Sequence, residues 1–239
     1  MRVPVLCYHR IELPPLGAER DSNFVTPQRF AEQMALLVRR GFSGVTVRDI
    51  AGWQRGERTL PPRPIAITFD DAYESVATNA IPLLASLGWP CTIFVVTSQI
   101  GGTNAWDAGA PSATLMTAST LRTLAAAGHE IGSHSRTHRR IRQLADDITS
   151  AELAGSRADL ENVLGAPVDS FAFPYGSHDP TVLTRVGEAG YRAACTLKRW
   201  SNPQRANPLR IGRMGVGGPL PTWQFMLKLT KMSLTPSRA

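Results

Sequence analysis

Short β-branched runs alternate with longer amphipathic segments along most of the chain, and this alternation constrains the fold more than any other feature. The runs include VPVLCYH at residues 3–9 and PIAITFD at 64–70, and the amphipathic segments include TPQRFAEQMALLVRRG at 26–41 and SVATNAIPLLASLG at 75–88. The alternation predicts a parallel sheet, and uninterrupted apolar runs predict strands covered on both faces. About seven or eight repeats favour closure into a TIM-like α/β barrel over a doubly wound open sheet.

The composition indicates one folded domain over residues 1–239. Hydrophobic residues make up 43% of the chain and charged residues 19%, which supplies enough apolar material for a sizeable core. The sequence contains no evident linker or low-complexity stretch. A tail at about residues 220–232 has apolar residues at helical spacing and two lysines. We expect this helical tail to pack on the barrel, with peripheral attachment to a membrane surface as the alternative.

Charge and cysteine usage exclude several other classes of protein. The formal net charge of +7 comes mainly from scattered arginines without interleaved aromatic residues, so we expect no nucleic-acid partner. Cys7, Cys91 and Cys195 lie in apolar stretches and are expected to be core residues. We see no signal peptide and no apolar stretch of about 18 residues, so the sequence predicts a cytoplasmic protein. The oligomeric state is not predicted.

Distinctive side chains stand where the predicted strands end. They are His9, Asp70, Asp71, His134, His138, Pro174 and Tyr175. In an α/β barrel the carboxyl ends of the strands meet at one mouth, which holds the active site. Residues that are far apart in the sequence are therefore expected to converge there.

The histidine pair in GSHSRTH, at residues 132–138, has the spacing of metal ligands. His134 and His138 are four residues apart, so a helical turn would put both rings on one side. Two imidazoles and one carboxylate, with room left for water, are typical of catalytic rather than structural zinc. The alternative is a solvated pair on a surface turn.

The adjacent carboxylates Asp70 and Asp71 end a buried strand. Successive side chains of a strand point to opposite faces, so one carboxylate can reach a metal while its neighbour faces the bound water. A divalent cation would favour the ionised form of both. The alternative is an Asp that caps the following helix, which explains one carboxylate but not the pair.

Three motifs in this order are similar to those of a known family. TFDD at 68–71, GSHSRTH at 132–138 and FAFPYG at 171–176 resemble the polysaccharide deacetylase family, the carbohydrate esterases of family 4 that share the NodB homology domain. The resemblance covers about residues 3–215, which would form the domain core. It implies an irregular (β/α)7 barrel and a hydrolase of carbohydrate metabolism that removes acetyl groups from a saccharide substrate.

The resemblance also assigns roles at the mouth of the barrel. It implies that Asp70 is the catalytic base and that Asp71, His134 and His138 hold one divalent metal ion. Zn²⁺ is the expected ion, and Co²⁺, Ni²⁺ or Fe²⁺ are alternatives.

Two positions depart from the family pattern. The third motif of the family carries an Arg that orients the catalytic Asp, but Ala172 stands at that position here. Another group must then orient Asp70, for which Arg210 and Arg213 are candidates. The last predicted strand, LRIGRM at residues 209–214, also lacks the His that the family uses as its general acid.

His9 is the candidate for the missing acid. The opening VPVLCYHR resembles that of the subgroup acting on poly-N-acetylglucosamine, in which the acid His lies near the start of the domain, and FAFP agrees with its third motif. We therefore expect His9 to protonate the leaving group, with a buried structural His as the alternative. His129 and His178 are expected to be solvated or to support the site indirectly.

Substrate contacts are expected from two segments beside the ligands. The turn at Pro174 and Tyr175 would supply a backbone N–H that stabilises the oxyanion, as the resemblance implies. Trp106, in the long connection 98–116, would stack on a sugar ring or pack this loop on the barrel.

The expected activity is metal-dependent removal of N-acetyl groups from an N-acetylglucosamine-type saccharide or glycoconjugate precursor. Three alternatives remain open: an amide hydrolase of a small molecule that is not a polysaccharide, a catalytically impaired saccharide-binding relative, and a basic interaction protein.

Overall fold

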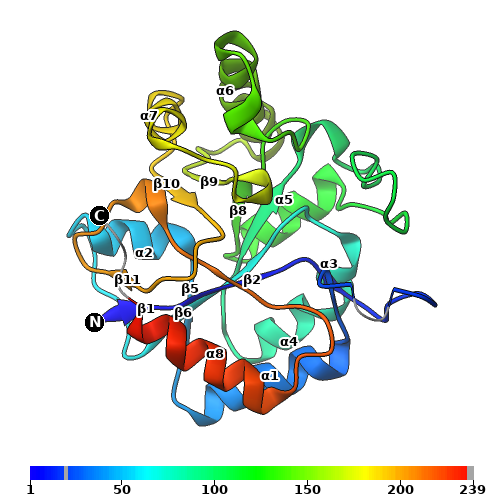
Figure 1. Cartoon of the computed structure of the whole chain (residues 1–239), viewed down its shortest axis with the longest axis vertical. Helices are drawn as coiled ribbons and strands as arrows, with labels where there is room; N and C mark the ends of the chain where they lie inside the picture. The colour runs from blue at the N-terminus through cyan, green and yellow to red at the C-terminus, as the bar shows by residue number, and fades with distance from the viewer. Residues whose placement is uncertain (19–20, 236–239) are drawn as a thin grey trace.

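The computed structural model describes residues 1–18 and 21–235 and shows a curled parallel sheet surrounded by helices (Figure 1). The strand order is β10, β9, β8, β7, β6, β2 and β12, and β5 also pairs with β6. The strands are β2 (Val5–Tyr8), β5 (Ser43–Val45), β6 (Pro64–Phe69), β7 (Thr92–Val95), β8 (Glu130–Ser133), β9 (Ser170–Ala172), β10 (Ala193–Cys195) and β12 (Met214–Gly215). All of these pairings are parallel, as the sequence predicted.

The segment from Ile211 to Gly215 joins the two edges of this sheet. Ile211 forms a parallel bridge with Cys195 of β10, and β12 pairs in parallel with Leu6 and Cys7 of β2. The sheet thereby curls into an irregular barrel. The predicted TIM-like α/β class is confirmed, and the doubly wound alternative is wrong.

Helices connect the strands and cover the outside of the sheet. The helices are α1 (Pro27–Arg39), α2 (Val47–Gln54), α3 (Glu74–Asn79), α4 (Ile81–Ser86), α5 (Ala118–Ala126), α6 (Asp146–Leu164), α7 (Pro180–Glu188) and α8 (Thr222–Leu234). Single-turn 3₁₀ helices are η1 (Thr97–Gln99), η2 (Ile141–Gln143), η3 (Pro174–Gly176) and η4 (Pro208–Arg210). Two short pairs complete the fold: β1 (Arg2–Val3) with β11 (Asn202–Pro203), and β3 (Arg10–Ile11) with β4 (Phe24–Val25).

Two helical features differ from the sequence expectation. The segment 75–88 forms two helices, α3 and α4, because Pro82 in the first turn of α4 has no N–H to donate to the preceding turn. Helix α2 was not predicted from the apolar pattern. Its signal is a capping box, in which Thr46 and Asp49 satisfy each other's backbone N–H groups.

The two faces of the strands pack into separate cores, as the period of two along a strand requires. In β6, Ile65 and Ile67 belong to the outer core beneath the helices, whereas Ala66 belongs to the inner core within the barrel. The inner core also contains Phe94 and Ala172 from neighbouring strands. Positions in register with Ala66 therefore point into the barrel.

The amino-terminal end of the barrel is closed by a buried polar cluster beneath α2. The Glu130 carboxylate accepts hydrogen bonds from Thr92 Oγ1 at 2.8 Å, Ser170 Oγ at 2.5 Å and the Arg48 backbone N–H at 2.9 Å. Burial raises the pKa of Glu130, and these donors partly offset that effect. These three donors hold Glu130 in place and give it a structural role at this end of the barrel.

The C-terminal tail forms α8, which lies beside α1 along the lower edge of the molecule in Figure 1. Phe225, Leu229 and Met232 are buried in the outer core, so the tail packs on the barrel. Trp223 remains 67% exposed. None of the helices in the described part of the chain is long and apolar enough to cross a membrane.

Candidate active site

Three predicted metal ligands converge at the carboxyl ends of β6 and β8. The Nε2 atom of His138 lies 3.3 Å from Asp71 Oδ1, and the Nε2 atom of His134 lies 3.6 Å from the same oxygen. All three side chains are buried. Asp71 Oδ1 has no hydrogen-bond partner within residues 1–18 and 21–235. A buried carboxylate oxygen without a donor is costly, and a cation shared with the two imidazoles would remove that cost.

The hydrogen bond behind His134 fixes which of its nitrogens faces the cluster. Nδ1 lies 2.8 Å from the Ala172 carbonyl oxygen, which can only accept, so Nδ1 carries the proton and Nε2 keeps its lone pair. Burial lowers the pKa of His134 to about 4, so its ring is neutral at pH 7. A neutral imidazole that presents Nε2 is the form that binds a metal.

The Asp71 carboxylate is ionised despite its surroundings. Burial alone would raise its pKa, but the neighbouring His138 and His134 side chains outweigh burial and bring the pKa below its ordinary value. The donor set of one carboxylate and two imidazoles fits a divalent transition metal of the zinc type.

Unusual backbone conformations accompany these side chains. Most of the non-glycine residues with positive φ in the described ranges lie here: Asp71, Ala72, Ser135, His138 and Tyr175. Such conformations cost on the order of 1–3 kcal/mol each and persist only when the surroundings enforce them. They turn the chain sharply out of the sheet, so that the residues just after each strand point back to the barrel axis.

The turn that carries His138 is held from outside by α6. Glu152 accepts from the backbone N–H groups of Arg136 at 2.8 Å and Thr137 at 2.9 Å. Ser135 Oγ accepts from the His138 backbone N–H at 3.0 Å. The position of the second imidazole therefore depends on a buried carboxylate that the sequence analysis did not single out.

Asp70 faces a different partner. Arg213 donates from Nη1 to Asp70 Oδ1 at 2.6 Å and from Nη2 to Asp70 Oδ2 at 2.8 Å, and both side chains are buried. Arg213 also bonds to Thr68 Oγ1 and to the Thr196 carbonyl oxygen. Burial would raise the pKa of Asp70, but the Arg213 guanidinium outweighs it and holds the pKa well below its usual range.

Arg213 thus occupies the role that Ala172 cannot fill. The sequence left Arg210 and Arg213 open, and the structure selects Arg213, since the Arg210 guanidinium lies over the Trp200 ring, 4.8 Å from its centroid. Arg213 reaches Asp70 from the segment that closes the barrel. Ala172 contributes only its carbonyl oxygen, which orients His134.

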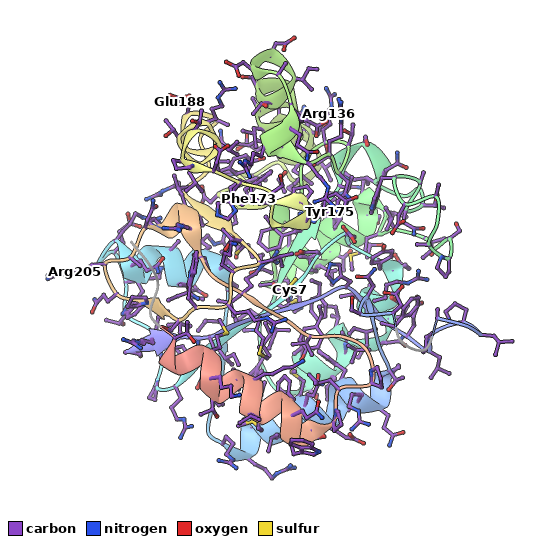
Figure 2. The ribbon with its side chains drawn as sticks, in the orientation of Figure 1. Cys7, Arg136, Phe173, Tyr175, Glu188 and Arg205 are labelled. Atoms are coloured by element: carbon purple, nitrogen blue, oxygen red, sulfur yellow. The ribbon has the colours of Figure 1, made fainter. Side chains whose placement is uncertain are left out.

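His9 and Cys7 also lie beside Asp70. The ligand atoms of Cys7, His9 and Asp70 all lie within 4.8 Å of one another. The Cys7 thiol donates to Asp70 Oδ2 at 3.3 Å, and Cys7 lies near the middle of the view in Figure 2. Cys7 was predicted only as a core residue. Its position two residues before His9 could have shown that Cys7 faces the inside of the barrel, although that spacing does not indicate its partner.

Aromatic side chains cover the outer ligand, His138. The Trp106 ring lies 4.8 Å from it, centroid to centroid, and the Tyr175 ring lies 4.7 Å away at 64°. The Tyr175 hydroxyl is 3.2 Å from His138 Nδ1. Pro174 is buried at the start of η3, the turn that brings Tyr175 over the cluster. Trp106 therefore packs the long loop onto the mouth, and its contact with a sugar stays a prediction.

The other two histidines do not join the ligands. His129 lies at the opposite end of the barrel, where its Nδ1 accepts from the Cys91 backbone N–H at 3.2 Å. It is only 6% exposed, so the expectation of a solvated ring is wrong for this residue. His178 stacks on Phe173 beside the mouth, with ring centroids 5.2 Å apart.

Comparison with known proteins identifies the family of this chain. A family model described as polysaccharide deacetylase matches residues 57–194, more than half of the chain. This chain belongs to the polysaccharide deacetylase family. The matched segment includes Asp70 and the three candidate metal ligands. His9 and Arg213 lie outside it.

The sequences of individual relatives support this family assignment. It is 23% identical over 197 residues to the putative polysaccharide deacetylase YxkH of Bacillus subtilis, a match covering 82% of this chain and 65% of that protein. It is 35% identical over 87 residues to the poly-beta-1,6-N-acetyl-D-glucosamine N-deacetylase of Escherichia coli strain K12, covering 36% of this chain but 12% of that protein. The chain thus spans less than two thirds of either relative.

The fold of this family member is also seen in a solved structure. IcaB from Ammonifex degensii superposes with a TM-score of 0.80 at 23% identity, and the alignment covers 95% of this chain and 97% of that one. This likeness independently supports the barrel described above.

Proposed function

We propose that this protein is a metal-dependent hydrolase that removes N-acetyl groups from an N-acetylglucosamine-type saccharide or glycoconjugate. The observation that carries the proposal is the buried, unpartnered Asp71 Oδ1 facing the Nε2 atoms of two histidines. A second carboxylate, that of Asp70, is paired with Arg213 and lies beside them, with Oδ2 3.8 Å from His134 Nε2. The family assignment and the Escherichia coli relative, whose name states N-deacetylation, support the reaction type.

In this proposal Asp70 accepts the proton of the attacking water. Its three donors, two from Arg213 and one from Cys7, leave one of about four lone-pair sites on the carboxylate free. Its low pKa makes it a weak base for ordinary water. A divalent cation held by Asp71, His134 and His138 would lower the pKa of that water and polarise the acetyl carbonyl.

The remaining roles fall to the His9 side chain and the Tyr175 backbone. His9 donates a proton to the departing amine, which would otherwise leave as an unstable anion. The backbone N–H of Tyr175 donates to the oxygen that gains negative charge. An impaired, purely saccharide-binding protein is less well supported, since Arg213 supplies the brace whose absence at Ala172 suggested it.

Removing the metal tests the proposal directly. Treatment with a chelator should reduce acetate release from N-acetylglucosamine oligomers to background, because the three ligands alone supply no electrophile. Restoring Zn²⁺ or Co²⁺ at one equivalent should recover it. Full activity in a preparation shown by elemental analysis to be free of metal would contradict the proposal.

Replacing His9 by Ala should lower the rate of N-deacetylation on the order of a hundredfold or more. An aryl acetate, whose leaving group needs no proton, is the matched control substrate and should lose much less activity. Metal content should stay unchanged. Equal losses on both substrates would indicate a structural role for His9 instead of proton donation.

A further inference from the structure

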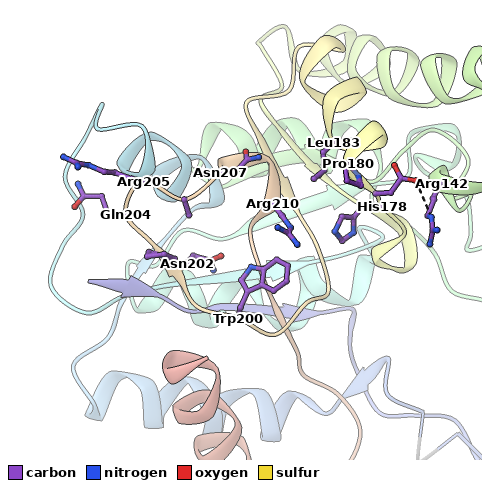
Figure 3. A pocket seen from close by; sticks show the side chains of 13 residues that line it. Arg142, His178, Pro180, Leu183, Trp200, Asn202, Gln204, Arg205, Asn207 and Arg210 are labelled. Carbon is purple, nitrogen blue, oxygen red and sulfur yellow. Dashed lines mark ion pairs between the residues drawn. The ribbon is translucent and has the colours of Figure 1, made fainter. Parts of the chain in front are cut away.

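A large open groove adjoins the candidate active site and continues along the barrel to β11, which pairs with β1. It consists of two cavities of about 880 and 650 Å³ that share Arg142 and His178 in their walls. Figure 3 shows the larger one, with Trp200 and Arg210 near its centre and His178 and Arg142 at one side. The walls come from segments that follow β8, β9 and β10, whose carboxyl ends form the mouth.

The smaller cavity starts next to the metal-ligand cluster. Arg140 and Gly176 line it, and Gly176 directly follows Tyr175. The Arg140 guanidinium lies over the Tyr175 ring, 4.0 Å from its centroid, and the Tyr175 hydroxyl lies 3.2 Å from His138 Nδ1. A ligand with one end at the cluster can therefore continue into the groove past Tyr175.

The charges in the groove are almost all positive. Arg140, Arg142 and Lys198 line the smaller cavity, and Arg205 and Arg210 extend the positive charge through the larger one. Within the described ranges, Asp179 is the only carboxylate in either wall. It lies 3.4 Å from Arg142 Nε in a pair whose Arg side chain is 64% exposed.

This one Asp cannot neutralise the groove. An exposed ion pair contributes little, and a single carboxylate stands against the cations of Arg140, Arg142, Lys198 and Arg205. Like charges gathered on a concave surface raise the local potential and attract an anion. Guanidinium groups also match the geometry of phosphate and carboxylate oxygens.

We propose that the groove binds an anionic group of the substrate, a phosphate or a carboxylate, so that the enzyme acts on an anionic saccharide. The acetylated sugar lies at the metal-ligand cluster and the charged unit lies beyond Tyr175, against Arg142 and Lys198. This inference rests on the proposed deacetylase function. It narrows the substrate from N-acetylglucosamine polymers in general to those that carry negative charge.

Matched oligosaccharides test the inference. Acetate release is compared for a neutral N-acetylglucosamine oligomer, the same oligomer with a neighbouring uronic acid, and the same oligomer ending in a 1-phosphate. We expect KM for at least one anionic substrate to be about tenfold lower than for the neutral one, with the advantage shrinking at high salt because exposed charges are screened. Comparing KM for the uronic acid substrate with KM for the 1-phosphate substrate shows whether the groove prefers a carboxylate or a phosphate.

A double variant assigns the effect to the groove. Arg142→Gln with Lys198→Gln should remove most of the KM advantage while kcat and the kinetics on the neutral oligomer stay unchanged. Arg39→Gln, at the exposed end of α1, removes a charge at the other end of the barrel and should retain the advantage. Equal KM values for neutral and anionic substrates, or an advantage that survives in the double variant, would overturn the proposal.

Binding separates this proposal from the deacetylase function. If no substrate releases acetate, the proposed function fails, and calorimetry of the same oligomers with the unmodified protein still tests the groove. Tighter binding of an anionic oligomer, lost in the double variant, would support the groove alone. Equal binding of all oligomers would reject it.

Discussion

Replacing Asp70 by Asn should lower kcat for acetate release on the order of a thousandfold, with a small change in KM. The amide keeps the shape of the carboxylate but cannot accept the proton of the attacking water. The metal content should stay near that of the unmodified protein, because Asp71, His134 and His138 are unchanged. Steady-state kinetics and elemental analysis of the same preparation measure both quantities.

A matched surface change controls for the loss of one negative charge. Asp147→Asn, at an exposed position in the first turn of α6, should leave kcat within about twofold, since it lies outside the cluster. If Asp70→Asn retained more than a tenth of the activity with a normal metal content, a different group would have to be the base.

Replacing Arg213 by Met should reduce the free energy of unfolding by about 3–5 kcal/mol. The change removes the charged partner of Asp70 but leaves the carboxylate buried, 2% exposed, where burial then raises its pKa. The pair stabilises the fold fully above the ordinary pKa of Asp, near 3.9, and this contribution is lost as the pH falls through the lower pKa of the folded protein. Urea unfolding at pH 7 therefore measures its full effect.

A second substitution tests whether the loss of stability arises because Asp70 stays buried and charged without its partner. Combining Arg213→Met with Asp70→Asn should destabilise the protein less than the sum of the two single changes, because the groups interact directly. Additive losses would mean that Arg213 acts through packing alone. A loss below about 1 kcal/mol for Arg213→Met would show that the pair is not held as the structure shows it.

The sequence predicted the barrel fold and the convergence of the candidate metal ligands at the strand ends. The parallel barrel follows from alternating periodicity, and the meeting of Asp71 with His134 and His138 follows from the rule that carboxyl ends of parallel strands share one edge. The four-residue spacing of the histidines indicated a ligand pair, although their side chains meet through turns with positive φ and not through one helix face.

The sequence alone could not decide whether Arg210 or Arg213 orients Asp70. Arg210 and Arg213 lie three positions apart around the last strand, and the sequence does not show where that strand begins. In the structure Arg210 ends η4, whereas Arg213 is two residues after Ile211, which points into the inner core. The direction of Arg213 follows from this register, which only tertiary pairing with β10 and β2 fixes.

Other differences arise from local chemistry that apolar periodicity does not capture. The capping box of Thr46 and Asp49 starts α2 after a very short strand, and Pro82 divides the segment that follows the carboxylates. The contact between Cys7 and Asp70 joins neighbouring strands, so no spacing within one segment signals it.

The closure of the barrel by the last strand has a consequence for how activity depends on the length of the chain. Residues 57–194, which match the family model, include the three proposed metal ligands. They omit His9, the proposed proton donor, and Arg213, which pairs with the proposed base Asp70. A fragment trimmed to that stretch would at best capture an ion without turnover. In the proposed mechanism, turnover therefore requires that β2, which precedes His9, pair with the closing segment that carries Arg213.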